Sequence, residues 1–311
     1  MTVLITGASG FIGSWLTLRL ADAGQNVTAQ MRRAPSALFE QLGLCEHANV
    51  DVVVEPSMES VLTATQPETL YHLAGMSQVG EALRSPAVAM EANGRATWLL
   101  FEALRQMEVP PNTVIASTDS IYGETSGQAA TEDFPTNALG PYEVSKLMAD
   151  TAARSYAWVF GLPVTVARLG NVYGPHDANG ARIVPSIVSA VSQGNRPVLR
   201  GGGRAVRSLL YVEDCIKALR LLAEKAGADG VQGEAFNLSG DPPMTTLQIA
   251  RHTLDAFGFA DVDPEIIEGA PGETSEKFSS PQKAERVLGW RPETPFEDGI
   301  KSVYSAWKEA Q

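Results

Sequence analysis

Residues 3–13 read Val3-Leu4-Ile5-Thr6-Gly7-Ala8-Ser9-Gly10-Phe11-Ile12-Gly13. A β-branched, apolar run here enters a turn in which glycine recurs every third residue, and a helical pattern starts at the last glycine. Residues without Cβ let the backbone reverse sharply, so that a pyrophosphate can approach the first amides of the helix. We therefore predict a dinucleotide-binding turn at Gly7, Gly10 and Gly13, with Phe11 and Ile12 beside it. The spacing differs from the G-x-G-x-x-G fingerprint, and a plain tight turn is the alternative.

The rest of the chain extends this start into a fold. Strand patterns at 3–6, 27–30, 50–54, 69–73, 113–117 and 164–168 alternate with helical patterns at 11–23, 37–42, 87–107 and 141–160. This alternation predicts an α/β protein with a Rossmann-type, doubly wound parallel sheet. We expect residues 1–170, with a return segment at about 206–237, to form the dinucleotide-binding domain. Glycine and proline become dense after residue 170, so residues 171–205 and 238–311 are expected to form a smaller C-terminal substrate-binding lobe, with the site in the cleft.

Composition narrows the classes of partner. The 311 residues include 44% hydrophobic and 19% charged residues, which is typical of a globular protein, and the net charge is −12. This charge disfavours nucleic acid and anionic membrane surfaces as partners. Cys45 and Cys215 lack the paired spacing of zinc or redox motifs, so no metal site is predicted. With neither a signal-like segment nor a membrane-spanning apolar run, we expect a cytoplasmic protein.

The end of the second predicted strand bears on the choice of cofactor. Many NAD-binding chains place an acidic residue there, against the ribose 2′-hydroxyl, whereas this chain has Arg32 and Arg33. Arginine can pair with a 2′-phosphate through bidentate hydrogen bonds. The pattern favours NADP over NAD, with a solvated loop as the alternative for the two arginines and NAD still a possible cofactor.

A candidate catalytic pair lies in the helical pattern at 141–160. Tyr142 and Lys146 are four residues apart, which places them on one helical face about 5–6 Å from each other. A neighbouring ammonium, together with a cationic nicotinamide ring, would lower the pKa of the tyrosine from about 10 and let it exchange a proton with a sugar hydroxyl. By spacing alone such a pair is more often structural.

Polar residues at the end of the strand at 113–117 strengthen the catalytic interpretation. Thr118, Asp119 and Ser120 follow this strand, and the carboxyl ends of strands face the ligand crevice in open α/β sheets. Thr118 can hydrogen-bond the oxygen that Tyr142 protonates, and Asp119 can supply a second proton. The alternative is a strand-ending turn with satisfied hydroxyls.

Across essentially its whole length the chain resembles the extended short-chain dehydrogenase/reductases, in particular the NAD-dependent epimerase/dehydratase family that modifies nucleotide sugars. The resemblance rests on the glycine turn, Tyr71-His72-Leu73-Ala74, Tyr142 with Lys146, the segment from Arg168 to Pro175, Tyr211-Val212-Glu213-Asp214 and Leu288-Gly289-Trp290-Arg291-Pro292. It implies Thr118, Tyr142 and Lys146 as the catalytic triad, and Leu73 and Ala74 beside the dinucleotide. It also implies a nucleotide-diphosphate sugar as substrate, with Ser120, Asn171, Arg182, Val198 and Arg207 around it. Family members pair the helices near 87–107 and 141–160 in a homodimer.

Narrower resemblances point to different reactions. The segments Gly13-Ser14-Trp15-Leu16 and Ser36-Ala37-Leu38-Phe39-Glu40 look most like CDP-glucose 4,6-dehydratase, whereas Met31-Arg32-Arg33 looks like GDP-mannose 4,6-dehydratase and its partner 4-ketoreductases. In dehydratases of the family the Thr118 position is followed by Asp-Glu in the dTDP-glucose enzymes and by Asp-Lys in the CDP-glucose enzymes, whereas this chain has Asp119-Ser120. A serine hydroxyl is too weak a base for a carbon acid.

The sequence therefore favours an NADP(H)-dependent reductase of a GDP- or CDP-linked 4-keto-6-deoxyhexose. A 4,6-dehydratase that uses Asp119 is the alternative, a 4-epimerase comes third, and a non-catalytic dinucleotide sensor is disfavoured by the triad.

Overall fold

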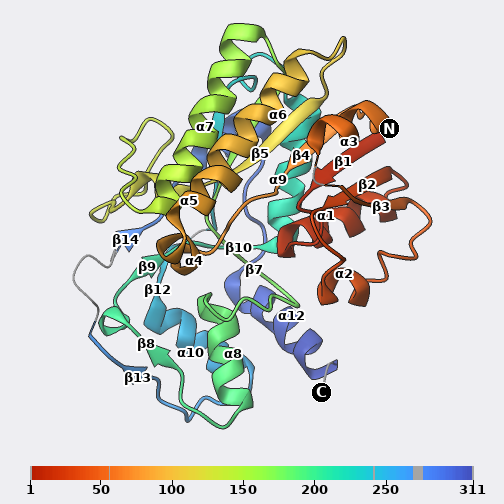
Figure 1. Ribbon diagram of the computed structural model, residues 1–311. Coiled ribbons are helices and arrows are strands. Elements are labelled where there is room, and N and C mark those ends of the chain that lie inside the picture. The colour runs from red at the N-terminus through yellow and green to blue at the C-terminus, as the bar shows by residue number, and fades with distance from the viewer. Residues whose placement is uncertain (1, 56, 241, 269–275, 310–311) are drawn as a thin grey trace.

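A seven-stranded parallel sheet forms the centre of the computed structural model, which describes residues 2–55, 57–240, 242–268 and 276–309 (Figure 1). The strand order is β11-β6-β5-β4-β1-β2-β3. The strands are β1 (Thr2–Thr6), β2 (Asn26–Met31), β3 (Val50–Val54), β4 (Thr69–His72), β5 (Asn112–Thr118), β6 (Val164–Leu169) and β11 (Ala235–Leu238). This is the Rossmann-type, doubly wound α/β fold predicted from the sequence. The order reverses between β1 and β4, and ligands of such sheets bind at the carboxyl ends beside that point.

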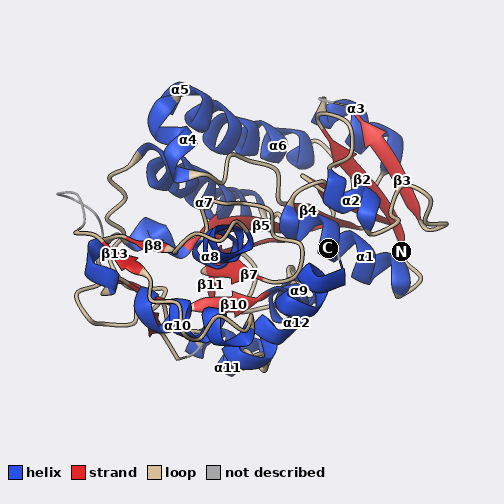
Figure 2. Cartoon of the chain, turned by 90° about the horizontal axis from the view of Figure 1, so that it is seen from below, coloured by secondary structure: helices blue, strands red, loops and turns tan. Residues whose placement is uncertain are grey.

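Helices cover both faces of the sheet (Figures 1 and 2). One face carries α1 (Phe11–Asp22), α2 (Ala37–Gln41), α9 (Val212–Lys225) and α11 (Gln282–Leu288), and the other carries α3 (Met58–Thr65), α6 (Ala96–Arg105) and α7 (Pro141–Phe160). Successive side chains of a strand point to opposite faces. Accordingly Val3 and Ile5 lie in the α1 core while Leu4 lies in the α7 core.

Short strands and three helices make up the second lobe. β7 (Asn171–Tyr173) pairs with β10 (Leu209–Tyr211), β8 (Val198–Leu199) pairs with β13 (Glu265–Ile266), and β9 (Val206–Arg207) lies between β12 (Met244–Thr245) and β14 (Glu276–Lys277). The helices are α8 (Ile183–Ser192), α10 (Thr246–Ala256) and α12 (Phe296–Glu309), and they share apolar cores. Residues 241, 269–275 and 310–311 of the predicted lobe lie outside the described residues. Within the described ranges, no helix has the length and apolar character needed to cross a membrane.

The helix predicted at 87–107 is not regular. After α4 (Val79–Arg84) and α5 (Pro86–Ala89) the chain forms a π-helical turn, η1 (Met90–Arg95), which leads into α6. The wide turn directs Asn93 inward: its Oδ1 accepts from Met76 N at 2.8 Å, and its Nδ2 donates to Met76 O at 3.0 Å and to Ser145 Oγ at 2.8 Å. The π turn therefore fixes the loop after β4 against α7. Such turns are frequent at functional sites.

The outer surface of α6 and α7 leads to a prediction about assembly. Trp98 and Leu99 on α6 are 42% and 46% exposed, and Trp158 on α7 is 88% exposed, whereas Phe101 packs inside the protein's own core. Large apolar side chains gathered on neighbouring helices mark an interaction surface. We expect a homodimer in sedimentation velocity at micromolar concentration. Leu99→Arg should shift the protein toward monomer without lowering its thermal stability as a monomer, and a wild-type monomer under these conditions would contradict the prediction.

Candidate functional site

The glycine turn packs backbone against backbone at the carboxyl ends of β1 and β4. Gly7 has a φ of +70°, and a Cβ at this residue would lie 2.7 Å from Ala74 N. A Cβ at Gly13 would lie 2.3 Å from Gly7 O, so α1 begins directly against the turn. Gly10, the N-cap of α1, provides no side-chain hydrogen bond to the first amides of the helix. A cradle that Cβ atoms would fill, next to free helix amides, fits the pyrophosphate of a dinucleotide.

A buried histidine, His72, stabilises this cradle. His72 was not identified as a site residue from the sequence. His72 Nδ1 lies 2.8 Å from Thr6 Oγ1, and His72 Nε2 lies 3.2 Å from Thr97 Oγ1. The same Thr6 hydroxyl accepts a hydrogen bond from Ala74 N at 3.3 Å. Burial, assisted by the positive charge of Lys146, lowers the pKa of His72 to about 3, so the ring is neutral. His72 thus joins β1, β4 and α6 below the turn.

Arg32 and Arg33 lie on the loop that follows β2, and both are exposed. This loop is linked to the glycine turn, because Ser36 Oγ donates to Ser9 O at 2.7 Å and Ala8 N donates to Gln30 O at 3.3 Å. The arginines therefore belong to a segment that borders the cradle. Whether they contact a 2′-phosphate stays a prediction.

The catalytic pair lies on the first turns of α7, with Lys146 anchored to the sheet. Lys146 Nζ donates to Ala116 O of β5 at 2.9 Å, and burial lowers the pKa of Lys146 to about 8. Burial raises the pKa of Tyr142 to about 12; a hydrogen bond with Thr118 lowers it, and the charges of Asp119 and Glu143 raise it further. The spacing of Tyr142 and Lys146 predicts a lowered pKa for Tyr142, whereas in the protein alone this pKa is raised. Thr118 lies near enough to affect the Tyr142 pKa; that the two bind one substrate oxygen stays a prediction.

Asp119 opens a short 3₁₀ turn, η2 (Asp119–Tyr122), at the end of β5. Burial raises its pKa to about 7, against the opposing positive charges of Lys277 and Arg207. Ser120 N donates to Thr118 Oγ1 at 3.2 Å, so Ser120 contributes to the turn. Asp119 can thus hold or release a proton near neutral pH. Lys277, on a strand of two residues, was not among the predicted site residues.

The substrate residues implied by the resemblance are only partly gathered. Arg182, the N-cap of α8, pairs with Asp177 at 3.0 Å and lies 5.6 Å from the centre of the Phe11 ring. Its charge lowers the pKa of Tyr142, and that of Arg207 lowers the pKa of Asp119, so the two arginines lie near these candidate catalytic residues. Asn171 is exposed where β7 begins. Val198 is exposed on β8, and the contacts described for the chain do not join it to this cluster.

A buried ion pair holds the elements of the site together. Arg168 on β6 makes two hydrogen bonds to Asp150 of α7, with Nε to Oδ2 at 2.9 Å and Nη2 to Oδ1 at 3.0 Å. Its Nη1 donates to the hydroxyl of Tyr122 in η2 at 2.8 Å, and Ser117 Oγ on β5 donates to Asp150 Oδ2 at 2.9 Å. One guanidinium therefore fixes β5, β6, α7 and η2, the elements that carry Thr118, Asp119, Tyr142 and Lys146.

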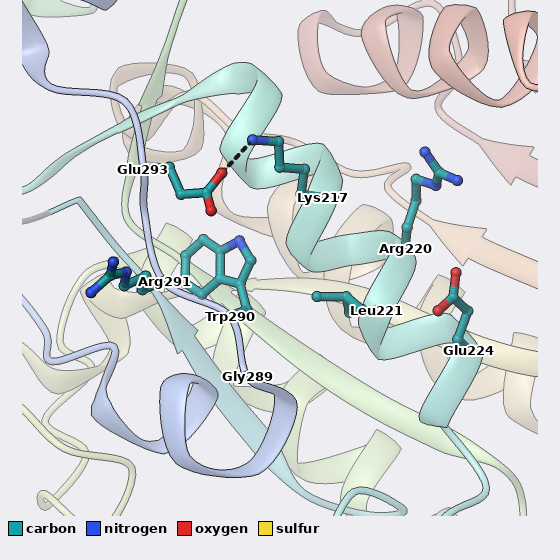
Figure 3. Close-up of a pocket in the computed structure, with 8 residues that line it drawn as sticks. All are labelled: Lys217, Arg220, Leu221, Glu224, Gly289, Trp290, Arg291 and Glu293. Atoms are coloured by element: carbon teal, nitrogen blue, oxygen red, sulfur yellow. Dashed lines mark hydrogen bonds and ion pairs between the residues drawn. The ribbon is translucent and has the colours of Figure 1, made fainter.

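A pocket of about 310 Å³ lies apart from these residues, between α9 and the segment after α11 (Figure 3). Lys217 points across it to Glu293, at 2.8 Å, and Trp290 forms its floor with its indole nitrogen bonded to Asp214 O at 3.1 Å. Its lining contains none of the predicted site residues. The Lys217–Glu293 ion pair and the hydrogen bond of Trp290 hold the C-terminal segment against α9. We therefore interpret this pocket as a gap in the packing between that segment and α9.

Comparisons with known proteins agree with the geometry. The sequence profile of the family described as GDP-mannose 4,6 dehydratase matches residues 4–303. The chain is 30% identical over 326 residues to dTDP-glucose 4,6-dehydratase of Streptomyces antibioticus, covering 99% of this chain and 93% of that one.

Solved structures extend the comparison. A dTDP-glucose 4,6-dehydratase from Streptomyces venezuelae with NAD bound superposes with a TM-score of 0.88 at 26% identity, covering 99% of this chain and 97% of that one. A variant UDP-glucuronic acid 4-epimerase from Bacillus cereus, also with NAD, superposes with a TM-score of 0.90 at 25% identity, covering 100% of both chains. These relatives are dehydratases and an epimerase, so they support the alternative reaction better than the keto-sugar reductase that the sequence favours.

The buried pair gives a prediction for stability. Asp150→Asn keeps the shape of the side chain but leaves the Arg168 guanidinium buried without a counter-charge, which typically costs about 3–5 kcal/mol. We expect a loss of this size in the free energy of unfolding from urea titrations. Asp22→Asn is a matched control, because Asp22 pairs with Arg19 at the surface, where such pairs contribute about 0–1 kcal/mol. Equal losses in the two variants would contradict this account.

Proposed function

The chain belongs to the GDP-mannose 4,6-dehydratase family of the extended short-chain dehydrogenase/reductases, and on this premise we propose that it is a nucleotide-sugar 4,6-dehydratase. In this reaction C4 of the hexose is oxidised to a ketone as its hydride leaves for the dinucleotide, and water is lost across C5 and C6. The same hydride then returns to C6 while a proton is added at C5, so the product is a 4-keto-6-deoxy sugar and no cofactor is consumed. The observation that carries the proposal is Asp119, a carboxyl group beside Tyr142 and Thr118 whose pKa is about 7.

The cradle and the two site arginines account for binding. Gly7, Gly10 and Gly13 would hold the pyrophosphate of a nicotinamide dinucleotide against the start of α1 and the backbone of Ala74. When bound, the dinucleotide supplies the hydride acceptor and donor. Arg182 and Arg207 are proposed to bind the diphosphate of the sugar through charge-assisted hydrogen bonds.

Tyr142 is proposed to take the proton of the C4 hydroxyl as the ketone forms, with Thr118 orienting the same oxygen. Burial keeps Tyr142 protonated at neutral pH, so positive charge has to favour its phenolate form. Arg182 acts in this direction, and Lys146 stands one helical turn away. General acid–base groups of this kind contribute about 10²–10⁴-fold to rate.

Asp119 is proposed to transfer the second proton in two successive steps. The C4 ketone acidifies the C5–H bond; the Asp119 carboxylate removes that proton, and the electron pair is held as an enolate. The C6–O bond then breaks, and Asp119 returns the proton to the departing hydroxyl, which leaves as water. A group whose pKa is near the working pH serves both directions. This path needs no base at position 120.

A 4-epimerase is the second candidate, and Ser120 is the observation that favours it. Position 120 has no ionisable side chain to promote loss of the C6 hydroxyl. A 4-keto sugar could therefore rotate within the site, accept hydride on its opposite face and keep this hydroxyl. The B. cereus epimerase shares the whole fold.

Product analysis tests the proposed reaction. The protein with catalytic NAD or NADP should convert at least one of CDP-glucose, GDP-mannose, dTDP-glucose and UDP-glucose into a 4-keto-6-deoxy sugar with no net consumption of cofactor. Tyr142→Phe should reduce turnover by about 10²–10⁴-fold. An inverted C4 sugar with an intact C6 hydroxyl would identify the epimerase. Stoichiometric oxidation of NADPH by a 4-keto-6-deoxy sugar, without dehydration of any hexose, would show that the protein is the reductase that the sequence favours.

The cofactor preference is proposed to be NADP, on the strength of Arg32 and Arg33. Their loop is joined to the glycine turn through Ser36 and Ser9, although the NAD in both solved relatives gives this choice no support. Replacing both arginines by alanine should weaken NADPH binding about tenfold or more while leaving NADH binding nearly unchanged, measured by fluorescence titration. Equal losses of affinity for NADPH and NADH would show that the two arginines do not set the cofactor preference.

A further inference from the structure

β14 brings a lysine to Asp119 from a distant part of the chain. Lys277 Nζ lies 3.4 Å from Glu143 Oε1, and the two side chains are only 18% and 11% exposed. Glu143 follows Tyr142 on the first turn of α7. The ion pair therefore stands beside the catalytic tyrosine, in a region where charges are poorly screened.

The position of Lys277 is fixed by its neighbours. Thr125 N donates to Glu276 O at 3.0 Å, and Ala130 N donates to Phe278 O at 3.1 Å, so the segment around Lys277 is bonded to the loop that follows η2. On its other side β14 pairs with β9 in a register that places Lys277 opposite Arg207 (Figure 1). β14 also contacts η2 itself, the turn that begins with Asp119.

The groups around Asp119 come from several elements. Gly170 lies against the carboxyl group, since a Cβ there would be 3.4 Å from Asp119 Oδ2 and from Ser208 O. From α7 the facing groups are Tyr142 and Glu143, from β5 the Thr118 hydroxyl, and from β9 and β14 the cations of Arg207 and Lys277. Of the two cations Lys277 has the larger influence on Asp119.

We propose that Lys277 is a positioning residue of the catalytic site, whose ammonium, held by Glu143, keeps the Asp119 carboxylate available for proton transfer. The proposal rests on the proposed function, in which Asp119 moves the C5 proton. It adds a charged partner from β14, a strand that the sequence pattern does not assign to the site. Ser120, the residue after Asp119, is uncharged, so the positive charge near Asp119 comes from the second lobe.

The direction of the effect can be worked out. A nearby positive charge favours the ionised form of a carboxyl group and lowers its pKa. Removal of the Lys277 charge should therefore raise the pKa of Asp119 above its value of about 7. At neutral pH a larger fraction of Asp119 would then be protonated and unable to accept the C5 proton.

The test is a carboxyl titration by ¹³C NMR on full-length protein labelled at aspartate, with Asp119→Asn used to assign the signal. Lys277→Met should raise the Asp119 titration midpoint by about one pH unit. Lys277→Arg, which keeps the charge, should leave it near the wild-type value. Lys283→Met is the matched control, because Lys283 is also 18% exposed and ion-paired, but with Glu234, away from the site. It should not move the midpoint.

Two results would overturn the proposal: an unchanged midpoint in Lys277→Met, or an equal rise in Lys277→Met and Lys277→Arg, which would assign the effect to packing. The titration uses no substrate, so it decides the proposal even if no nucleotide sugar is dehydrated and the proposed function fails. Where turnover is found, the acidic limb of the pH–rate profile should move upward in Lys277→Met by the same amount as the NMR midpoint.

Discussion

The geometry of the site depends on one guanidinium that is closed off from water. Arg168 has almost no exposed surface, and its hydrogen bonds run to α7, to η2 and to the Glu132 carbonyl. A buried charge requires its partners in place, because each one lost leaves an uncompensated charge. The strand ends and the catalytic helix are therefore held in one relative position. Thr118 and Tyr142 come from different elements and still lie close together.

Burial at this site works against ionisation, and local charges decide which groups ionise. Desolvation raises the pKa values of Tyr142 and Asp119 and lowers that of Lys146, so each is shifted toward its neutral form. The positive charges that oppose the shifts of Tyr142 and Asp119 come from the second lobe, through Arg182, Arg207 and Lys277. The large domain thus carries the candidate catalytic residues, and the small lobe carries the positive charges that act on two of them.

The fold follows from local pattern, whereas the electrostatic partners do not. The glycines at 7, 10 and 13, the alternation of strands and helices, and the Tyr142–Lys146 spacing are short-range signals. They predict correctly the sheet and the helix that contains Tyr142 and Lys146. The π turn is hidden, because apolar periodicity does not separate a helix with one wide turn from a regular one. Lys277 and Glu143 are far apart in the chain and meet because β14 pairs with β9 and is hydrogen-bonded to the loop after η2. Two-residue strands leave no periodic signal from which that pairing could be predicted.

The π turn at Met90–Arg95 also sets the phase of the helix that contains it. Each residue advances an α-helix by about 100°, so an extra residue in one turn rotates everything beyond it by that angle. With the turn in place, Asn93 faces the loop after β4 while Leu100 and Leu104 face the sheet. Loss of one residue here would rotate either Asn93 off the loop or Leu100 off the core. The number of residues in this helix is therefore fixed by two contacts on its opposite sides, Asn93 with the loop and Leu100 with the core.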